Sequence, residues 1–198
     1  MNIDLLIQSA KNNVSEIVLN SKAEPRSVLA RYTAATAVNF TDWLGKTTPW
    51  VRHEDSYRAL VDNLRCEAEH DHVGMLLEFA KLSKSSPEKE DYELVSDDVS
   101  KIRALFKDST LSGIRGLALS AFLENTSEIF IPDLAQKAKS LGCSNFTYTD
   151  VHGEADKEHS EAFVNALKSE VTMGYENPEN LITEVFETSL NLLRRVYS

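Results

Sequence analysis

The sequence predicts an all-α protein, and three observations support this prediction. Apolar residues recur at intervals of three and four through most of the chain, which is the period of an amphipathic helix. Helix breakers are few, with 7 glycines and 5 prolines in 198 residues, as expected for helices joined by short connections. The segment from Ser144 to Tyr148 is a candidate for a short extended piece, which is too little for a sheet.

Start and stop signals divide the first half of the chain into three helices. They are expected over residues 2–20, Ser27 to Gly45 and 54–82. Ser27 can cap the second helix with its hydroxyl, and Gly45 is a suitable end for it. Pro25 and Pro49 lie in the breaks on either side of that helix.

The second half of the chain is expected to hold five further helices. Their expected ranges are 97–107, 111–129, 132–142, 150–173 and 178 to the end of the last apolar stripe. Pro132 and Pro178 suit the first turn of a helix. Gly113 and Gly116 lie inside a helical pattern, which marks a place of close helix packing.

Composition narrows the classes of function. Hydrophobic residues make up 42% and charged residues 26% of the chain, which is typical of a soluble globular protein, and 198 residues suit a single domain over 1–198. The net charge of −10 and the lack of a basic stripe argue against a nucleic-acid partner. No apolar run suits a membrane span and no basic, apolar leader opens the chain, so a cytoplasmic protein is expected. Two cysteines do not form a disulfide framework, which agrees with this expectation.

A triplet of two histidines and an aspartate points to metal binding. His152, Asp156 and His159 are separated by four and three residues, so at about 100° per residue they share one face of a helix. Phe163 and Leu167 continue this face, which turns the triplet toward the core. A buried triplet without partners would cost several kcal/mol, and a bound metal is the simplest way to offset that cost.

Two overlapping Glu-x-x-His pairs lie in the helix expected over 54–82. They are Glu67 with His70 and Glu69 with His72. On a continuous helical wheel His72 lies near the centre of the apolar face and Glu69 lies at its flank. We therefore expect Glu69 and His72 to face the core. Glu67 and His70 should be solvated, with Glu67 as the reserve ligand. A glutamate three residues before a histidine is a building block of di-iron sites in helix bundles.

A third helix contributes another inward carboxylate. Glu124 shares a helical face with Leu117 and Ser120, and a carboxylate in such surroundings needs a cation or a hydrogen-bond donor. Glu128 lies one turn further along on the same side, and it can also be interpreted as a charge at a helix end. Glu124 is preferred because its surroundings are more apolar.

These residues together form a mixed set of oxygen and nitrogen ligands. The candidate metal ligands are Glu69, His72, Glu124, His152, Asp156 and His159. Several carboxylates beside imidazoles favour iron or manganese over structural zinc, which prefers thiolate. Six ligands suit two metal ions, so the expected cofactor is two irons, with manganese as the other option. No catalytic residue is expected beyond the ligands.

Simpler interpretations stand beside the metal site. A Glu-x-x-His pair alone is mostly surface decoration, and a histidine cluster can be a hydrogen-bonded part of the core. Four of the five histidines nevertheless fall in the two clusters, on faces expected to point inward. His53, the fifth, is expected in a loop or cap. Cys66 and Cys143 are expected to pack, since neither has an aligned base that would make it a nucleophile.

The motifs around these residues resemble those of the haem-oxygenase-like di-metal oxidases and oxygenases. This CADD-like group is related in fold to the TenA thiaminases and the PqqC oxidases. The resemblance runs from about Tyr32 to the C-terminus, and its markers are Asn63-Leu followed by acids, His72-Val-Gly-Met-Leu-Leu-Glu-Phe, Ala121-Phe-Leu-Glu124 and His152-x-x-x-Asp156-x-x-His159. It implies a seven-helix bundle with a metal site between core helices, and O₂ activation on a small organic substrate.

The sequence departs from this family pattern at one ligand position. Many relatives carry the first glutamate further upstream, but Arg65 stands seven residues before His72. This leaves Glu69 as the replacement. Haem oxygenase activity itself is not expected, since no proximal haem histidine is apparent near the N-terminus. TenA-like hydrolysis needs a catalytic cysteine, and neither cysteine is well placed.

The leading hypothesis is therefore a non-haem di-iron oxidase or oxygenase. Its partners would be O₂ and a small organic molecule, with an amine, amino-acid-derived or fatty-acid-like substrate ranked highest on the resemblance alone. A homodimer is likewise an expectation from the resemblance. The alternatives are a metal-free TenA-like hydrolase or PqqC-like oxidase, and a non-catalytic helical protein that binds a small molecule.

Overall fold

Most helices of this protein combine an apolar stripe with a capping residue or a proline at their start. The computed structural model describes the backbone of the whole chain and the side chains of residues 1–152 and 159–198, and the described backbone contains no strand. The α-helices are α1 (Ile3–Asn20), α2 (Pro25–Thr36), α3 (Asn39–Thr47), α4 (Glu54–Glu69), α5 (His72–Leu82), α6 (Lys89–Leu105), α7 (Ser109–Ser140), α8 (Thr147–Val171) and α9 (Pro178–Val196). A short 3₁₀ helix, η1 (Thr48–Trp50), follows α3. The predicted all-α class is confirmed.

The described backbone forms nine α-helices rather than the seven that the resemblance implied. Part of the difference comes from the segment expected to be one helix from Ser27 to Gly45, which is divided into α2 and α3. Near the division the side chain of Thr36 donates to the carbonyl of Tyr32, and that of Asn39 donates to the carbonyl of Ala35, both at 2.8 Å. Such side chains offer the backbone an alternative to continued helix.

Two other helix boundaries also differ from those expected. α6 begins at Lys89, well before the expected start near residue 97, because Glu88 and Asp91 form a capping box. α7 continues through Pro132, where a new helix was expected to start. Pro132 is exposed while Ile131 and Leu134 are buried, so packing of the neighbouring residues outweighs the lost backbone hydrogen bond.

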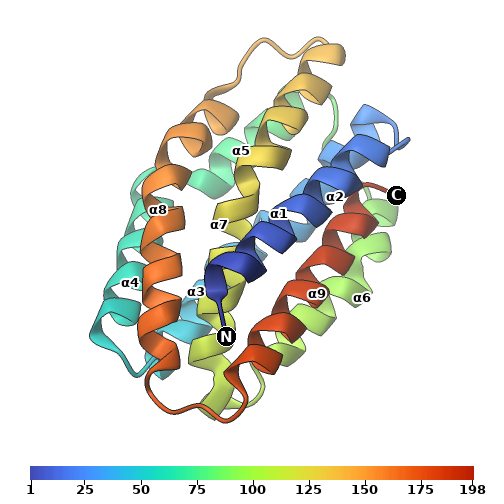
Figure 1. Ribbon diagram of the computed structural model, residues 1–198. Helices are drawn as coiled ribbons and strands as arrows, with labels where there is room; N and C mark the ends of the chain where they lie inside the picture. Colours follow the sequence, from blue (N-terminus) through green and yellow to red (C-terminus); the bar gives the residue numbers. More distant parts are fainter.

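α7 is the central helix of the bundle (Figure 1). It packs against α1, α2, α3, α8 and α9. Two of its glycines allow close contact with the end of α3 and with η1. A Cβ on Gly113 would lie 2.3 Å from the Trp50 carbonyl oxygen, and one on Gly116 would lie 2.2 Å from the Thr47 Cβ. The prediction of close helix packing at these glycines is therefore confirmed.

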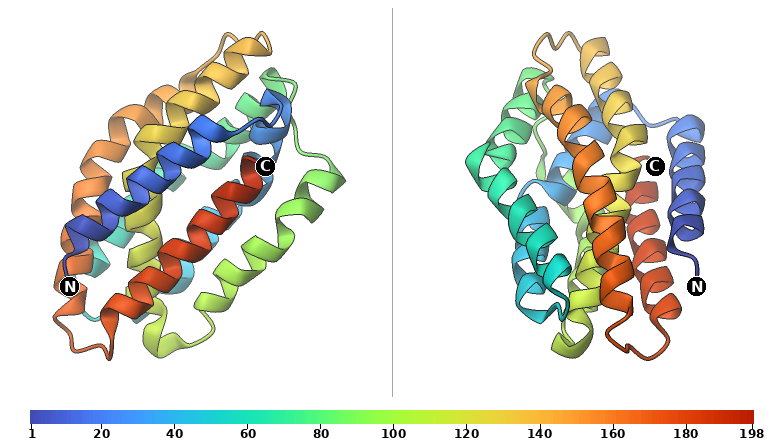
Figure 2. Two further views of the ribbon diagram at one scale, coloured as in Figure 1. Left: turned by 45° about the vertical axis from the view of Figure 1, so that its right-hand side comes forward. Right: turned by 60° about the vertical axis from the view of Figure 1, so that its left-hand side comes forward.

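The candidate ligands lie on α4, α5, α7 and α8, and these helices are neighbours. α8 packs against α4, α5 and α7, and α4 contacts α5. In the right-hand view of Figure 2, α4 and α5 lie on one side of α8 and α1 lies on the far side of the bundle. None of the described helices is long and apolar enough to cross a membrane.

Candidate metal centre

A break between α4 and α5 brings Glu67 and His72 together. Asp71 adopts the left-handed conformation, with φ 48° and ψ 51°, and its carboxylate accepts a hydrogen bond from the Gly74 amide at 3.1 Å. Aspartate tolerates this conformation better than most residues, and here it also caps α5. Because the helix changes direction, the Oε1 atom of Glu67 lies 2.8 Å from the Nδ1 atom of His72. Both side chains are buried.

This break overturns the expected pairing of Glu69 with His72. Glu69 is exposed on the last turn of α4. Glu67 takes the inward position that was expected for Glu69. The expectation was wrong because a helical wheel assumes one continuous helix from Glu67 to His72. His70 is exposed, as expected, and its ring stacks on that of His72 with centroids 5.9 Å apart.

His152 approaches the same point from α8. Its ring centroid lies 4.7 Å from that of His72, and its Nδ1 atom lies 2.8 Å from the carbonyl oxygen of Tyr148. Burial, which disfavours the imidazolium form, lowers the pKa of His152, so this histidine is neutral at neutral pH. Neutral imidazole is the form that binds metals.

The hydrogen bonds of both histidines fix which ring nitrogen is free. A carbonyl or carboxylate oxygen only accepts, so the Nδ1 atoms of His72 and His152 donate, and in the neutral form of each ring the Nε2 atom carries the lone pair. The Nε2 atom of His72 is buried and has no hydrogen-bond partner in the described structure. A buried acceptor left without a partner costs about 1–3 kcal/mol.

A metal ion would satisfy this unpartnered nitrogen. One potential ligand atom from each of Glu67, His72 and His152 lies within 4.8 Å of the others. A carboxylate that holds the Nδ1–H of a histidine is the usual arrangement behind a metal-bound imidazole. The donor set, one carboxylate and two imidazoles, therefore fits iron in its chemistry.

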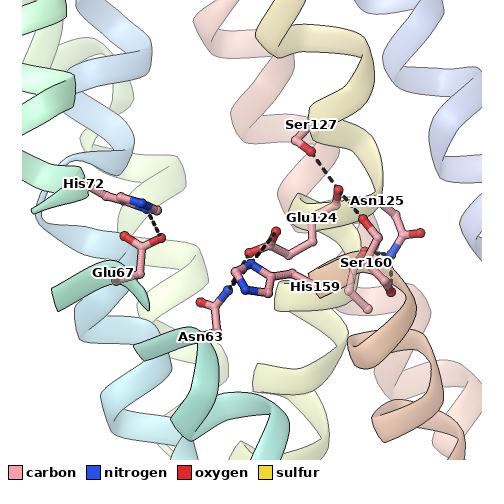
Figure 3. Close-up of polar contacts among 9 residues, drawn as sticks. Asn63, Glu67, His72, Glu124, Asn125, Ser127, His159 and Ser160 are labelled. Atoms are coloured by element: carbon pink, nitrogen blue, oxygen red, sulfur yellow. Dashed lines mark hydrogen bonds and ion pairs between the residues drawn. The ribbon is translucent and has the colours of Figure 1, made fainter. Parts of the chain in front are cut away.

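A second polar group lies deeper between α4, α7 and α8 (Figure 3). Asn63 is buried, and its amide nitrogen lies 3.1 Å from Oε1 of Glu124 and 3.1 Å from Nδ1 of His159. The Oε2 atom of Glu124 is 3.9 Å from the same His159 nitrogen. In Figure 3 the side chains of Glu124 and His159 extend toward Asn63, with Glu67 and His72 beyond it.

The main chain of Glu124 is braced by two hydroxyl groups. Ser127 donates to the Glu124 carbonyl oxygen at 2.7 Å and Ser160 donates to it at 2.8 Å. Ser127 follows on α7 and Ser160 comes from α8, so the two helices are tied together at the point where the carboxylate leaves α7. Glu128, the other glutamate considered, is exposed and pairs with Lys11 at 2.9 Å.

The remaining sequence expectations have mixed outcomes. Asp156 lies outside the described residues. His53 caps the start of α4, as expected, and Cys143 is buried. Sequence reasoning gave no ligand or positioning role to Asn63. This residue lies one helical turn before Glu67, on a face that was expected to be solvated, so the helical wheel gave no signal for it.

A cavity adjoins the Glu67, His72 and His152 cluster. It holds about 860 Å³ of space free of protein atoms, counting the part that opens to solvent, and Glu124 also lines it. The rest of the described lining is mostly aliphatic and aromatic. A mostly apolar cavity with a few polar groups at one end is a usual kind of site for a small organic molecule.

Comparison with known proteins agrees with this geometry. A sequence profile of iron-containing redox enzymes, from the haem-oxygenase-like group, matches residues 28–192. The chain belongs to this family of iron-containing redox enzymes. The match spans most of the chain and includes every candidate ligand. A search among curated proteins found no match. The family confirms the resemblance inferred from the motifs and implies iron, without specifying how many ions are bound.

Proposed function

We propose that this member of the iron-containing redox enzymes is a non-haem oxidase or oxygenase that uses O₂ to oxidise a small organic molecule. The observation that carries the proposal is the buried Nε2 atom of His72, which has no described partner and lies in a carboxylate and histidine cluster beside an apolar cavity. A histidine that only completed the core would be expected to use both ring nitrogens.

His72 and His152 would hold iron through their Nε2 atoms. Glu67 would keep the His72 ring in the required tautomer through Oε1, and its other carboxylate oxygen would be available to the metal. Iron, when bound, supplies one-electron and O₂ chemistry that no protein side chain provides.

The second polar group, formed by Asn63, Glu124 and His159, supports a proposal of two irons rather than one. Glu124 and His159, with Asp156 as predicted from the sequence, would supply the further ligands. Asn63 supports this proposal because its amide donates to Glu124 while its own Oδ1 atom is buried without a described partner. Asn63 thereby orients a carboxylate that faces the space between α4 and α7 (Figure 3).

The chain's own contribution is positioning and exclusion of water. The apolar lining of the cavity would surround the substrate and keep bulk water from the reacting centre. The low pKa of His152 keeps this imidazole neutral, so protons do not compete with the metal near neutral pH.

The direct test is anaerobic loading with ferrous iron, followed by metal analysis and O₂ uptake. We expect close to two irons per chain and O₂ consumption that differs from that of free ferrous ion. A natively folded chain that retains no iron would overturn the proposal in favour of a metal-free enzyme or a binding protein. One iron per chain would remove the two-iron part alone.

A further inference from the structure

The cavity changes character away from the glutamates and histidines. Beyond them, α2, α3, α6, α7 and α9 contribute aliphatic and aromatic side chains, among them Phe40, Ile102, Phe130 and Leu193. The polar groups in this part are the hydroxyl groups of serine, threonine and tyrosine and the indole N–H of Trp43. A molecule that fills it must therefore be largely apolar, because burial of apolar surface is the main available source of affinity.

The described lining of the cavity contains no lysine and no arginine. A carboxylate or phosphate buried in its apolar part would therefore meet no lysine or arginine of the described lining. The free-energy cost of its lost hydration would not be offset. An ammonium group in that part would be equally isolated, since the carboxylates of the lining, Glu67 and Glu124, belong to the proposed metal centre. The part of the substrate that lies there is consequently uncharged.

Trp43 adds one specific requirement. This tryptophan lines the cavity and is 1% exposed, and its indole Nε1–H has no hydrogen-bond partner in the described structure. Buried indole N–H groups usually have a partner. The other tryptophan, Trp50, is 48% exposed and does not line the cavity.

We infer that the part of the substrate that lies in this apolar region is uncharged and carries a hydrogen-bond acceptor, such as a carbonyl oxygen, for the indole N–H of Trp43. This inference deepens the proposed function and rests on it for the identification of the cavity as a substrate site. It disfavours substrates whose charged group would lie in this apolar region, where no described lysine or arginine could pair with it. Trp43 is then a residue that determines specificity through one hydrogen bond.

Three probes with the same number of carbon atoms test the charge requirement. They are 2-octanone, octanoate and octylamine, titrated by calorimetry into the full chain with its iron under anaerobic conditions and again after chelation. We expect the ketone to bind, and each charged probe to bind at least about tenfold more weakly after chelation. If octanoate or octylamine binds the chelated protein more tightly than 2-octanone does, or if 2-octanone does not bind, the inference is overturned.

The role of the indole is tested with Trp43→Phe, which keeps an aromatic ring and removes the N–H. The ketone should bind about three- to tenfold more weakly to this variant, the size of one neutral hydrogen bond. Trp50→Phe is the matched control and should bind the ketone as the wild type does. Equal affinity in Trp43→Phe and the wild type would show that the indole does not contact the ligand.

A spectroscopic measurement covers the case in which Trp43→Phe does not fold. In Trp50→Phe the remaining tryptophan is Trp43, so its emission reports on the cavity alone. A bond from Nε1–H to the ketone should shift this emission to longer wavelength, and an unchanged spectrum at saturation would contradict the inference. Iron binding without ketone binding would overturn the inference and leave the proposed function standing. Ketone binding without iron binding would overturn the proposed function, and the cavity would then be an apolar ligand site rather than a substrate site.

Discussion

At the scale of single residues, the candidate centre depends on which nitrogen of each histidine is free. Glu67 and the Tyr148 carbonyl each hold an Nδ1–H, so the lone pairs of His72 and His152 are on Nε2. Such partners commonly change metal affinity by tenfold or more when they are removed. The residue-scale predictions therefore compare each proposed ligand or partner with a neighbour that lacks its contacts.

His72→Ala should lower the iron content by at least about tenfold, because it removes the buried Nε2 atom. His70→Ala is the control, since His70 is exposed and no side-chain hydrogen bond from it is found in the described structure. Iron per chain is measured after anaerobic loading and gel filtration. Equal loss of iron in both variants would mean that the ring stacking of the two histidines, and not ligation, is what matters.

Glu67→Gln should weaken iron binding by about tenfold, since the amide oxygen can still accept from His72 but the negative charge is gone. Glu69→Gln changes the same charge on an exposed side chain and should leave iron affinity unchanged. Competition with a coloured chelator measures both. If Glu69→Gln weakens iron binding more than Glu67→Gln does, Glu69 faces the metal, as expected for one continuous helix.

The buried His152 predicts a pH dependence of stability in the metal-free protein. Its pKa is lowered by burial from 6.5, so at pH values just below 6.5 the unfolded chain binds a proton that the folded chain does not. Stability should therefore decrease as the pH falls through this value. His152→Gln removes the titrating group and should make the urea-unfolding free energy depend less steeply on pH between about 7 and 5. If the unfolding free energies of His152→Gln and the wild type change equally with pH, the pH dependence does not come from His152.

At the scale of helices, the break between α4 and α5 is the feature that assembles the cluster. It depends on the Asp71 cap, which in turn depends on Gly74: a Cβ at this position would lie 2.1 Å from the Asp71 carboxylate. The cap and the left-handed residue together determine where His72 stands relative to Glu67.

Gly74→Ala should displace the Asp71 carboxylate and remove the cap. Loss of a cap costs about 1 kcal/mol, which is close to the gain in helix propensity from alanine, so the net change in stability should be small. The variant should also bind iron more weakly, because His72 shifts with the first turn of α5. Gly45→Ala is the control, since a Cβ there meets nothing within 4 Å and should be neutral or stabilising. Thermal unfolding and iron content are measured for both, and a stable Gly74→Ala that binds iron normally would show that the cap is dispensable.

Local patterns predict elements better than they predict the joints between them. The helical class, the burial of His72 and the burial of Glu124 all follow from apolar periodicity, and the structure confirms them. The inward position of Glu67 does not follow, because it depends on a left-handed Asp71 that no periodicity reveals. The contact of Asn63 with Glu124 and His159 joins three helices, so it required their packing to be known.

At the scale of the whole molecule, the proposed ligands come from four helices that are separated in sequence. α4, α5, α7 and α8 meet at the cluster and the neighbouring polar group, so an ion bound there would link several helices of the bundle to one another. The unfolded chain does not hold these residues together. Binding to the folded state alone makes iron a stabilising ligand of the entire bundle.

Ferrous iron should therefore raise the melting temperature of the protein under anaerobic conditions. At a free iron concentration about 100 times the dissociation constant, the stabilisation is about 2.7 kcal/mol. For a chain of this size that corresponds to a shift of roughly 5–10 °C. His72→Ala should lose most of the shift, because the bond that draws α5 to the ion is gone, and His70→Ala should keep it. Magnesium at the same concentration should give a much smaller shift, since imidazole nitrogens bind iron better than they bind magnesium. Equal shifts with both ions, or an equal shift in His72→Ala, would point to binding at the acidic surface of this chain instead of at the buried cluster.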